Sequence, residues 1–321
     1  MEPALDAKAN PQTRRQISAE AQAIIAGLMA ENAWIAPKYF YDPLGSRLFE
    51  IITTLPEYYP TRLERDIFLQ SIGAIQALVG TGSTLIDLGA GNCAKAESLF
   101  AALRPQQYVA VDISSEYLSG VLRGLQQRHP GIDVFIVATD FSSELSLPAT
   151  IAEHARLFFF PGSSIGNFTP PQAGVLLRQI HSQCARDGHL LIGVDLLKGV
   201  NILEAAYNDP LGITAAFNLN VLNHVNSLIS SNFAVAGWRH RAFFNEIEGR
   251  IEMHLTARYE QTVNWPGGRR TFASGEQIHT ENSYKYDLDA FRHLLAQSGF
   301  DPVHCWTDPA RWFAVILGKA I

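Results

Sequence analysis

Short apolar runs alternate with amphipathic stretches from about Thr84 to Leu197. The apolar runs predict buried strands, which we place at residues 84–89, 108–114, 133–141, 156–167 and 188–196. Between several of them, apolar residues recur at helical spacing and predict helices at residues 94–103, 116–128 and 169–185. Alternation of this kind, with strands apolar on both faces, predicts a parallel sheet covered by helices on both sides.

The segments on either side of this block have other patterns. Ser18 to Glu31 has helical spacing, and two further helical patterns follow Lys198. Longer and more polar strands are expected at residues 250–265 and 269–281, and the turn Pro266-Gly267-Gly268 between them predicts a hairpin. The tail returns to the first style, with a helix at 288–298 and two closing strands.

These patterns predict an α/β protein of two domains that follow a short flexible N-terminus at residues 1–17. A doubly wound, Rossmann-like domain comprises residues 69–197 and is completed by residues 285–321. A second, α+β domain combines residues 18–68 with residues 198–284. We expect this second domain to bind the substrate.

The composition narrows the class of partner. Hydrophobic residues make up 47% and charged residues 17% of the chain, with a net charge of −6 and no lysine or arginine run, so we expect a small-molecule substrate and no nucleic acid. The three cysteines are unpaired in sequence and the ten histidines lack metal-like spacing, so no metal site is predicted. We find no signal peptide and no long apolar stretch, and expect a cytoplasmic protein without a membrane partner. A monomer is the simplest expectation for its assembly.

A glycine-rich turn, Asp87-Leu88-Gly89-Ala90-Gly91, stands where the first predicted strand ends. Glycines at this place let the backbone approach a ligand, and ligands of open α/β sheets bind at the carboxyl ends of the strands. Asp112 and Asp140 end the next two strands, where carboxylates can accept hydrogen bonds from a ribose and from an adenine amino group. Each acid could instead simply cap a turn, but jointly they favour S-adenosylmethionine over NAD. Lys95 could face the methionine carboxylate or be a solvated lysine of the first helical turn.

Several longer motifs, taken in order, resemble a known family. "KYFYDPLGSRLFE", "LPEYYPTR", "LIDLGAGNCAK", "SSIGNF", "AAYNDPLGITAAFNLNVL", "IEMHL" and "IHTENSYKY" are similar to the bacterial L-histidine Nα-methyltransferases of ergothioneine biosynthesis. The resemblance runs from about Ala36 to the C-terminus. It implies a class I methyltransferase domain with a substrate domain, and trimethylation of the α-amine of histidine to the betaine hercynine.

The resemblance also implies site residues, carried over position by position. The cofactor contacts are Tyr41, Gly89, Lys95, Asp112, Asp140 and Phe141. The substrate contacts are Tyr58, Asn167 and Tyr207, which hold the reacting amine and carboxylate, with Met253, Glu281 and Ser283 around the imidazole. An acid and a hydroxyl can hold the two imidazole nitrogens, which selects histidine over an apolar aromatic side chain. The resemblance implies an aliphatic residue between Glu281 and Ser283, and this chain has Asn282 there.

Three alternatives stay open from the sequence. The first is an α-N-methyltransferase for another amino acid such as tryptophan or tyrosine, which Glu281 and Met253 disfavour because an indole pocket would be apolar. The second is a nicotinamide-dependent oxidoreductase, which would share the strand-end nucleotide site. The third is a non-catalytic module that senses S-adenosylmethionine.

Overall fold

The computed structural model describes residues 11–113, 115–141, 143–185 and 187–321. The chain divides into two compact units. The first comprises residues up to Ile52, Tyr207–Phe243 and Glu252–Glu281, and the second comprises Thr53–Ala206, Phe244–Ile251 and Asn282–Ile321. Among the described residues, no helix is both long and apolar enough to span a membrane.

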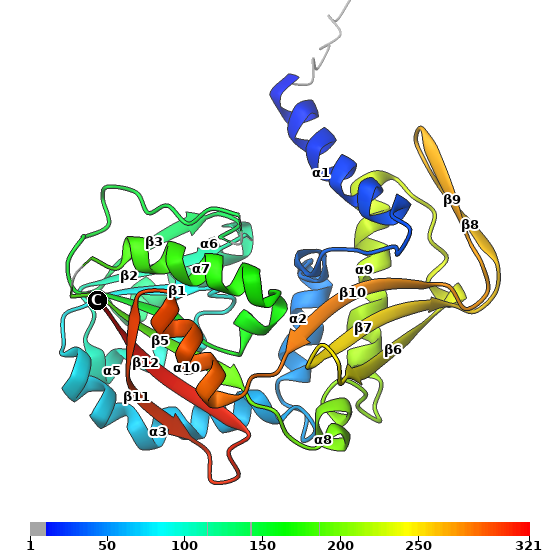
Figure 1. Ribbon diagram of the computed structural model, residues 1–321. Helices are drawn as coiled ribbons and strands as arrows, with labels where there is room; N and C mark the ends of the chain where they lie inside the picture. The colour runs from blue at the N-terminus through cyan, green and yellow to red at the C-terminus, as the bar shows by residue number, and fades with distance from the viewer. Residues whose placement is uncertain (1–10, 114, 142, 186) are drawn as a thin grey trace, which may run out of the picture. The chain divides into compact units, whose positions relative to one another are not determined.

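A seven-stranded sheet with the order β11-β12-β5-β4-β1-β2-β3 forms the centre of the second unit (Figure 1). Its strands are β1 (Thr84–Leu88), β2 (Gln107–Asp112), β3 (Asp133–Ala138), β4 (Arg156–Phe160), β5 (His189–Asp195), β11 (Phe300–Thr307) and β12 (Phe313–Ala320). The first five are parallel, and β12 is antiparallel to both β5 and β11. This mixed sheet with helices on both faces confirms the predicted Rossmann-like α/β fold.

Alternate residues of each central strand face opposite layers of helices. Phe158 and Phe160 pack with α7 (Pro170–Gln183) and α10 (Leu288–Gln297). Leu157 and Phe159 face the other layer, which contains the helices α3 (Tyr59–Val79), α4 (Ala94–Glu97), α5 (Phe100–Leu103) and α6 (Ser115–Arg128). Burial on both faces explains why these strands are continuous apolar runs in the sequence.

Two predicted elements of this unit differ from the structure. The expected helix at residues 94–103 is two short helices, α4 and α5. The expected strand at 156–167 is β4 followed by a 3₁₀ turn, η2 (Ser164–Asn167), because Gly162 has φ 77° and Ser163 has φ 57° and the chain turns there. The helix α3 spans the predicted domain boundary at residue 68, and it lies wholly in the second unit because Ile67, Phe68 and Ile75 pack on the sheet.

The first unit is built around α9 (Ile213–Ile229), which contacts α1 (Pro11–Met29), α2 (Pro43–Ile52) and the 3₁₀ turn η1 (Pro37–Phe40). A three-stranded sheet has the order β10-β7-β6. Its strands are β6 (Trp238–Asn245), β7 (Arg250–Ala257) and β10 (Gln277–Tyr284). Two short elements follow β5 and α9 in the chain: α8 (Val200–Ala205), which belongs to the second unit, and η3 (Val235–Gly237), which belongs to the first.

The predicted hairpin is present as β8 (Gln261–Trp265) and β9 (Gly268–Phe272), paired antiparallel with Trp265 opposite Gly268. The two long strands predicted here are each divided in the structure, so both predictions were wrong in extent. Residues 250–265 form β7 and β8, and residues 269–281 contribute to β9 and β10. The helix expected from Ser18 begins at Pro11, so the flexible segment expected at residues 1–17 is helical from Pro11 onward. Residues 1–10 of the expected flexible segment lie outside the described part of the chain.

Candidate functional site

The glycine-rich turn follows β1 at the carboxyl edge of the central sheet. Gly89 and Gly91 have φ of 73° and 51°, a region that residues with a Cβ rarely adopt. The backbone N–H groups of Gly89 and Ala90 both donate to the carbonyl of Val111, at 2.9 and 3.3 Å. A Cβ added to Gly89 would have the ring of Phe141 as its nearest neighbour, at 3.9 Å, so the glycine leaves an open surface at this turn.

Acidic residues at two neighbouring strand ends lie close to this turn. The carboxylate of Asp112, at the end of β2, accepts a hydrogen bond from the backbone N–H of Gly91 at 3.1 Å. Asp140 and Phe141 follow β3, which pairs with β2 through Asp112 and Ala138. The structure therefore brings Gly89, Asp112 and Phe141 together, and it places Asp140 after the neighbouring strand at the same edge of the sheet.

A buried carboxyl group lies beneath the turn. Asp87 is 2% exposed, and burial raises its pKa to about 7 although the hydroxyl of Tyr108 donates to it at 2.8 Å. Cys93 nearby is buried as well, and desolvation raises its pKa to about 12. A thiol that stays protonated is a poor nucleophile, so Cys93 fills space beneath the turn.

Lys95 is held in an ion pair. Its ammonium lies 2.6 Å from Oε2 of Glu64, a residue of α3 whose side chain is 1% exposed. The other oxygen of Glu64 accepts from the backbone N–H of Gly162 at 2.6 Å. A Cβ on Gly193 would stand only 2.1 Å from that oxygen, so glycine is required there to make room for the carboxylate. The ion pair fixes the Lys95 ammonium at the end of β4, and its side chain is still 38% exposed.

Three of the predicted substrate residues, Tyr58, Asn167 and Ser283, belong to this unit, and the last two lie close to each other. Asn167 ends the turn η2, directly after Gly166. A Cβ on Gly166 would be 2.8 Å from the carbonyl oxygen of Tyr284 and 3.6 Å from Oγ of Ser283, so the end of β10 passes directly over this turn. The hydroxyl of Tyr286 donates to the carbonyl of Ile165 at 3.3 Å and fixes the same contact.

A buried charged network adjoins Ser283. The ammonium of Lys285 donates to Oγ of Ser283 at 2.7 Å and lies 2.9 Å from Oδ2 of Asp195. Asp195 ends β5 and also pairs with Lys198 at 2.5 Å. Burial opposes ionisation of Asp195, but the two ammonium groups outweigh it and lower the pKa of the carboxyl group. Desolvation lowers the pKa of Lys198 to about 8, and its attraction to Asp195 offsets part of this effect.

This network was not predicted. Asp195 stands at the end of a strand, as Asp112 does, so the same reasoning could have identified it. Lys285 gave no signal, because it is ninety positions away from Asp195 in the sequence and only the fold brings the two together. Lys198 is only three positions from Asp195, and nothing in the sequence pattern marked it as buried.

The same network distinguishes Tyr58 from Tyr59. The hydroxyl of Tyr59 donates to both oxygens of Asp195, at 2.9 and 2.8 Å, and the residue is 2% exposed. Tyr58 precedes the first residue of α3 and is only half-buried. Tyr59 therefore has a structural role, and Tyr58 is the tyrosine of this pair with an accessible surface.

The remaining predicted residues belong to the first unit. Tyr41 is 37% exposed and its ring stands edge-on to Phe49 and Phe217. Tyr207 is 8% exposed, and its carbonyl accepts from His240 at 2.9 Å. Met253 in β7 is 1% exposed, and its carbonyl accepts from the hydroxyl of Thr280. Glu281 in β10 is half-buried, and its carbonyl accepts from His279 at 3.0 Å.

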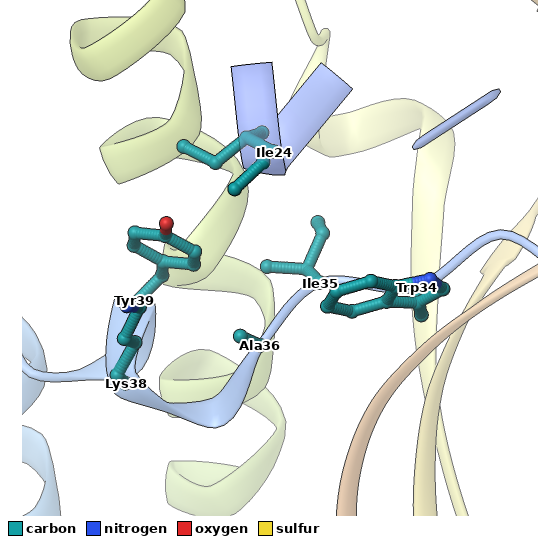
Figure 2. A pocket seen from close by; sticks show the side chains of 7 residues that line it. Ile24, Trp34, Ile35, Ala36, Lys38 and Tyr39 are labelled. Atoms are coloured by element: carbon teal, nitrogen blue, oxygen red, sulfur yellow. The ribbon is translucent and has the colours of Figure 1, made fainter. Parts of the chain in front are cut away.

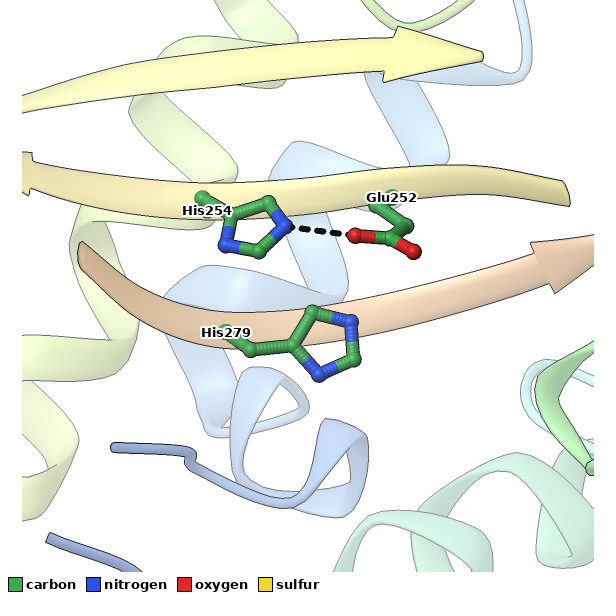
Figure 3. A group of neighbouring side chains, drawn as sticks. All are labelled: Glu252, His254 and His279. Carbon is green, nitrogen blue, oxygen red and sulfur yellow. Dashed lines mark hydrogen bonds and ion pairs between the residues drawn. The ribbon is translucent and has the colours of Figure 1, made fainter. Parts of the chain in front are cut away.

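Two histidines that the sequence did not connect meet a glutamate on the three-stranded sheet (Figure 3). The nitrogen and oxygen atoms of Glu252, His254 and His279 that could bind a metal lie within 4.8 Å of one another. Nε2 of His254 is 2.9 Å from the Glu252 carboxylate, and Nε2 of His279 donates to the carbonyl of Glu281. These hydrogen bonds explain why the three side chains lie together. The sequence did not indicate the cluster, because His279 is on a different strand from Glu252 and His254.

A small pocket of about 130 Å³ also lies in the first unit (Figure 2). Apolar side chains of α1 and the segment before η1 form most of its wall, among them Ile24, Trp34 and Ile35, with Lys38 and Tyr39 beside them. Among the described residues that line it, none is a predicted cofactor or substrate contact.

The fold and the glycine turn are those of a Rossmann-like nucleotide-binding domain, and the match to a family model makes the protein an S-adenosylmethionine-dependent methyltransferase of class I. A family model described as histidine-specific, SAM-dependent methyltransferase matches residues 20–320. The chain belongs to this family, and the resemblance seen in its motifs is confirmed.

Curated relatives agree with this assignment. The chain is 39% identical over 298 residues to the histidine N-alpha-methyltransferase of Mycolicibacterium smegmatis, covering 91% of this chain and 92% of that protein. It is 37% identical over 301 residues to the histidine N-alpha-methyltransferase of Mycobacterium tuberculosis, covering 92% of each. The ergothioneine biosynthesis protein 1 of Neurospora crassa is 30% identical over 289 residues, which are 87% of this chain and 32% of the fungal protein.

Proposed function

We propose that this protein methylates the α-amine of L-histidine three times with S-adenosylmethionine and releases the betaine hercynine. The names of the two mycobacterial relatives support the substrate and the position of methylation. The observation that carries the proposal is the proximity of Ser283 to the turn that holds Asn167, in the unit that also contains the glycine turn.

The residues around the glycine turn suit an adenosine with a methionine tail. The glycine turn leaves open surface, the carboxylate of Asp112 can accept from ribose hydroxyls, and the ring of Phe141 can pack on the adenine. Asp140 would accept from the adenine amino group. Lys95 offers a fixed ammonium to the methionine carboxylate, and Tyr41 is the contact proposed from the first unit.

The proposed substrate contacts divide by the part of histidine that they bind. Asn167 can bond both the amine and the carboxylate through its amide, and Tyr58 and Tyr207 offer hydroxyls to the same two groups. The tyrosine rings can also face the methylammonium that grows during the reaction. Glu281, Ser283 and Met253 would surround the imidazole, because an apolar side chain could not form hydrogen bonds with the carboxylate of Glu281 and the hydroxyl of Ser283.

The sulfonium of bound S-adenosylmethionine supplies an activated methyl group for in-line transfer. The protein therefore contributes mainly by positioning the neutral amine, which can lower the barrier by about 7–11 kcal/mol. Partial desolvation lowers the pKa of the amine and favours its neutral form. Three rounds require that the contacts to the amine accept a primary, a secondary and then a tertiary nitrogen.

A panel of the twenty amino acids tests the substrate directly. We expect methyl transfer to histidine to exceed transfer to any other amino acid, and faster turnover of tryptophan or tyrosine would refute the proposed specificity. The variant Asn167→Ala separates an enzyme from a sensor. We expect it to lose methyl transfer while it still binds S-adenosylhomocysteine, and undiminished transfer would remove Asn167 from the proposed site.

A further inference from the structure

A fully buried amide side chain lies in helix α9 of the first unit. Asn218 is 0% exposed, and its oxygen accepts from the hydroxyl of Thr280 in β10 at 2.8 Å. Its nitrogen donates to the carbonyl of His254 in β7 at 3.1 Å and lies 2.9 Å from Nδ1 of His240 in β6. Burying an amide is costly unless it is hydrogen-bonded, and here its oxygen and both hydrogens of its nitrogen are engaged.

The partners of Asn218 determine the protonation of the His240 ring. A carbonyl can only accept, so the atom that faces the His254 carbonyl must be the amide nitrogen of Asn218. The second hydrogen of that nitrogen points to Nδ1 of His240, which has to accept it. The other ring nitrogen, Nε2, faces the carbonyl of Tyr207 at 2.9 Å and has to carry the proton. His240 is therefore a neutral imidazole in the Nε2–H form, with both nitrogens engaged.

Burial favours this neutral form. Desolvation lowers the pKa of His240, and the carbonyl of Tyr207 and the carboxylate of Asp209 offset part of the effect. A protonated ring would also place an N–H at Nδ1 against the amide hydrogens of Asn218. The ring thus keeps one fixed donor towards the Tyr207 carbonyl at neutral pH.

Tyr207 begins a short segment that is anchored at each of its three residues. His240 holds the carbonyl of Tyr207, and the side chain of Asn208 donates to the carbonyl of Ala242 in β6 at 3.1 Å. The carboxylate of Asp209 accepts from the backbone N–H groups of the first two residues of α9, at 2.9 and 2.7 Å. Support of this kind fixes the backbone from which the Tyr207 side chain extends.

We propose that His240 is a positioning residue that, locked by Asn218, holds the backbone of Tyr207 and so directs the Tyr207 hydroxyl to the amino acid substrate. The inference rests on the proposed role of Tyr207 in binding the amine and carboxylate of histidine. In-line methyl transfer depends on the orientation of the amine, so a small displacement of a contact residue slows it strongly. His240 then acts on the reaction only through the carbonyl of Tyr207.

Two amide substitutions separate the two nitrogens of His240. The amide of glutamine reaches about as far as Nε2, so His240→Gln keeps a donor for the Tyr207 carbonyl. The amide of asparagine reaches only as far as Nδ1, so His240→Asn keeps a partner for Asn218 and loses Tyr207. We expect kcat/KM for histidine to fall about tenfold in His240→Asn and to stay within about threefold of wild type in His240→Gln.

The matched control removes another amide of the same helix. The side chain of Asn226 donates to the carbonyl of Phe233 at 2.9 Å, in a loop without a proposed contact residue. Asn226→Ala should lower the Tm, as His240→Asn does, and leave kcat/KM within about twofold of wild type.

A double-mutant cycle tests whether His240 acts through Tyr207. Tyr207→Phe removes the hydroxyl and should lower kcat/KM for histidine about tenfold or more, and His240→Asn should cause no further loss in this background. Long-range ¹H–¹⁵N NMR spectra report the tautomer, and the ring of His240 is identified by its absence in His240→Gln. We expect its Nε2 to be protonated and its Nδ1 to be unprotonated at about pH 7.

The outcomes distinguish this inference from the proposed function. If Tyr207→Phe leaves kcat/KM unchanged, the proposed substrate role of Tyr207 is wrong and the inference fails with it. If Tyr207→Phe is impaired but His240→Asn is not, only the role of His240 is overturned. An additive loss in the double variant, equal losses in His240→Gln and His240→Asn, an equal loss in Asn226→Ala, or an Nδ1–H tautomer would also overturn it. Should His240→Asn fail to fold, His240→Leu, which fills the volume without a polar group, carries the same comparison with His240→Gln.

Discussion

The buried carboxyl group of Asp87 should make the stability of the protein depend on pH in a way that one substitution removes. Its folded pKa is about 7 against an ordinary value of 3.8, because burial disfavours the charged form. A group with a raised folded pKa stabilises the native state fully below its unfolded pKa and loses that contribution as pH rises through the folded value. The shift of about three pKa units corresponds to about 4 kcal/mol in total.

The variant Asp87→Asn has the same shape and can still accept the hydrogen bond from Tyr108, but it does not titrate. Urea denaturation of the ligand-free protein at pH 5 and pH 8 gives the free energy of unfolding of both proteins. The carboxyl group of Asp87 in the unfolded chain titrates largely below pH 5, so part of the effect lies outside this range. Between pH 5 and pH 8 the free energy of unfolding of wild type should therefore fall by about 2–3 kcal/mol relative to that of the variant.

Groups that do not interact with Asp87 contribute equally in both proteins and cancel in this difference. The fixed cost or gain of the substitution cancels as well, because only its change with pH is compared. A difference in stability between wild type and variant that stays the same at pH 5 and pH 8 would refute the reasoning, and so would a relative gain of wild type as pH rises.

Three further predictions follow from the site. Asp112→Ala removes the acceptor proposed for the ribose and the bond to Gly91, so calorimetry should find S-adenosylhomocysteine bound about 10- to 100-fold more weakly; unchanged affinity would remove Asp112 from the cofactor site. Among the described residues, none hydrogen-bonds the buried Oδ1 of Asn282, so Asn282→Val should raise the free energy of unfolding by about 1 kcal/mol. Its KM for histidine should not change, because neighbouring residues of a strand point to opposite faces, and a clear rise would place Asn282 in the substrate pocket. Prolonged treatment with EDTA should leave the Tm unchanged, because hydrogen bonds already engage Nε2 of both His254 and His279; a lower Tm that zinc restores would identify a bound metal.

The centre of the large sheet was predictable because its inner strands β1, β2, β4, β5 and β12 are buried on both faces. Such strands are short apolar runs, and the acids Asp87 and Asp112 mark the edge where the chain leaves them. The antiparallel direction of β12 was harder to predict from the apolar run in the tail. The direction in which two strands pair depends on the connection between them and not on their composition.

The strand β6 was not predicted, and its composition explains the omission. Trp238 is 1% exposed, but Arg239, His240 and Arg241 follow it and interrupt the apolar pattern. The sequence does not show that Trp238 is buried. It also does not show the hydrogen bonds of this strand to distant residues, such as the bond of His240 to the carbonyl of Tyr207.

For the proposed site, the sequence singled out candidate contact residues but missed the residues that support them. Glycines and acids at strand ends have a local signature, which identified Gly89 and Asp112. Glu64, which holds Lys95, and Asp195, which holds Lys285, act across long sequence separations, and helical or strand periodicity carries no trace of such pairs.

Mass spectrometry of histidine incubated with the purified protein and S-adenosylmethionine tests the central claim most directly. We predict a product that has gained three methyl groups on the α-nitrogen and none on the imidazole, with one- and two-methyl species as precursors. Unmethylated histidine, in a reaction where the same protein methylates another amino acid, would contradict the account.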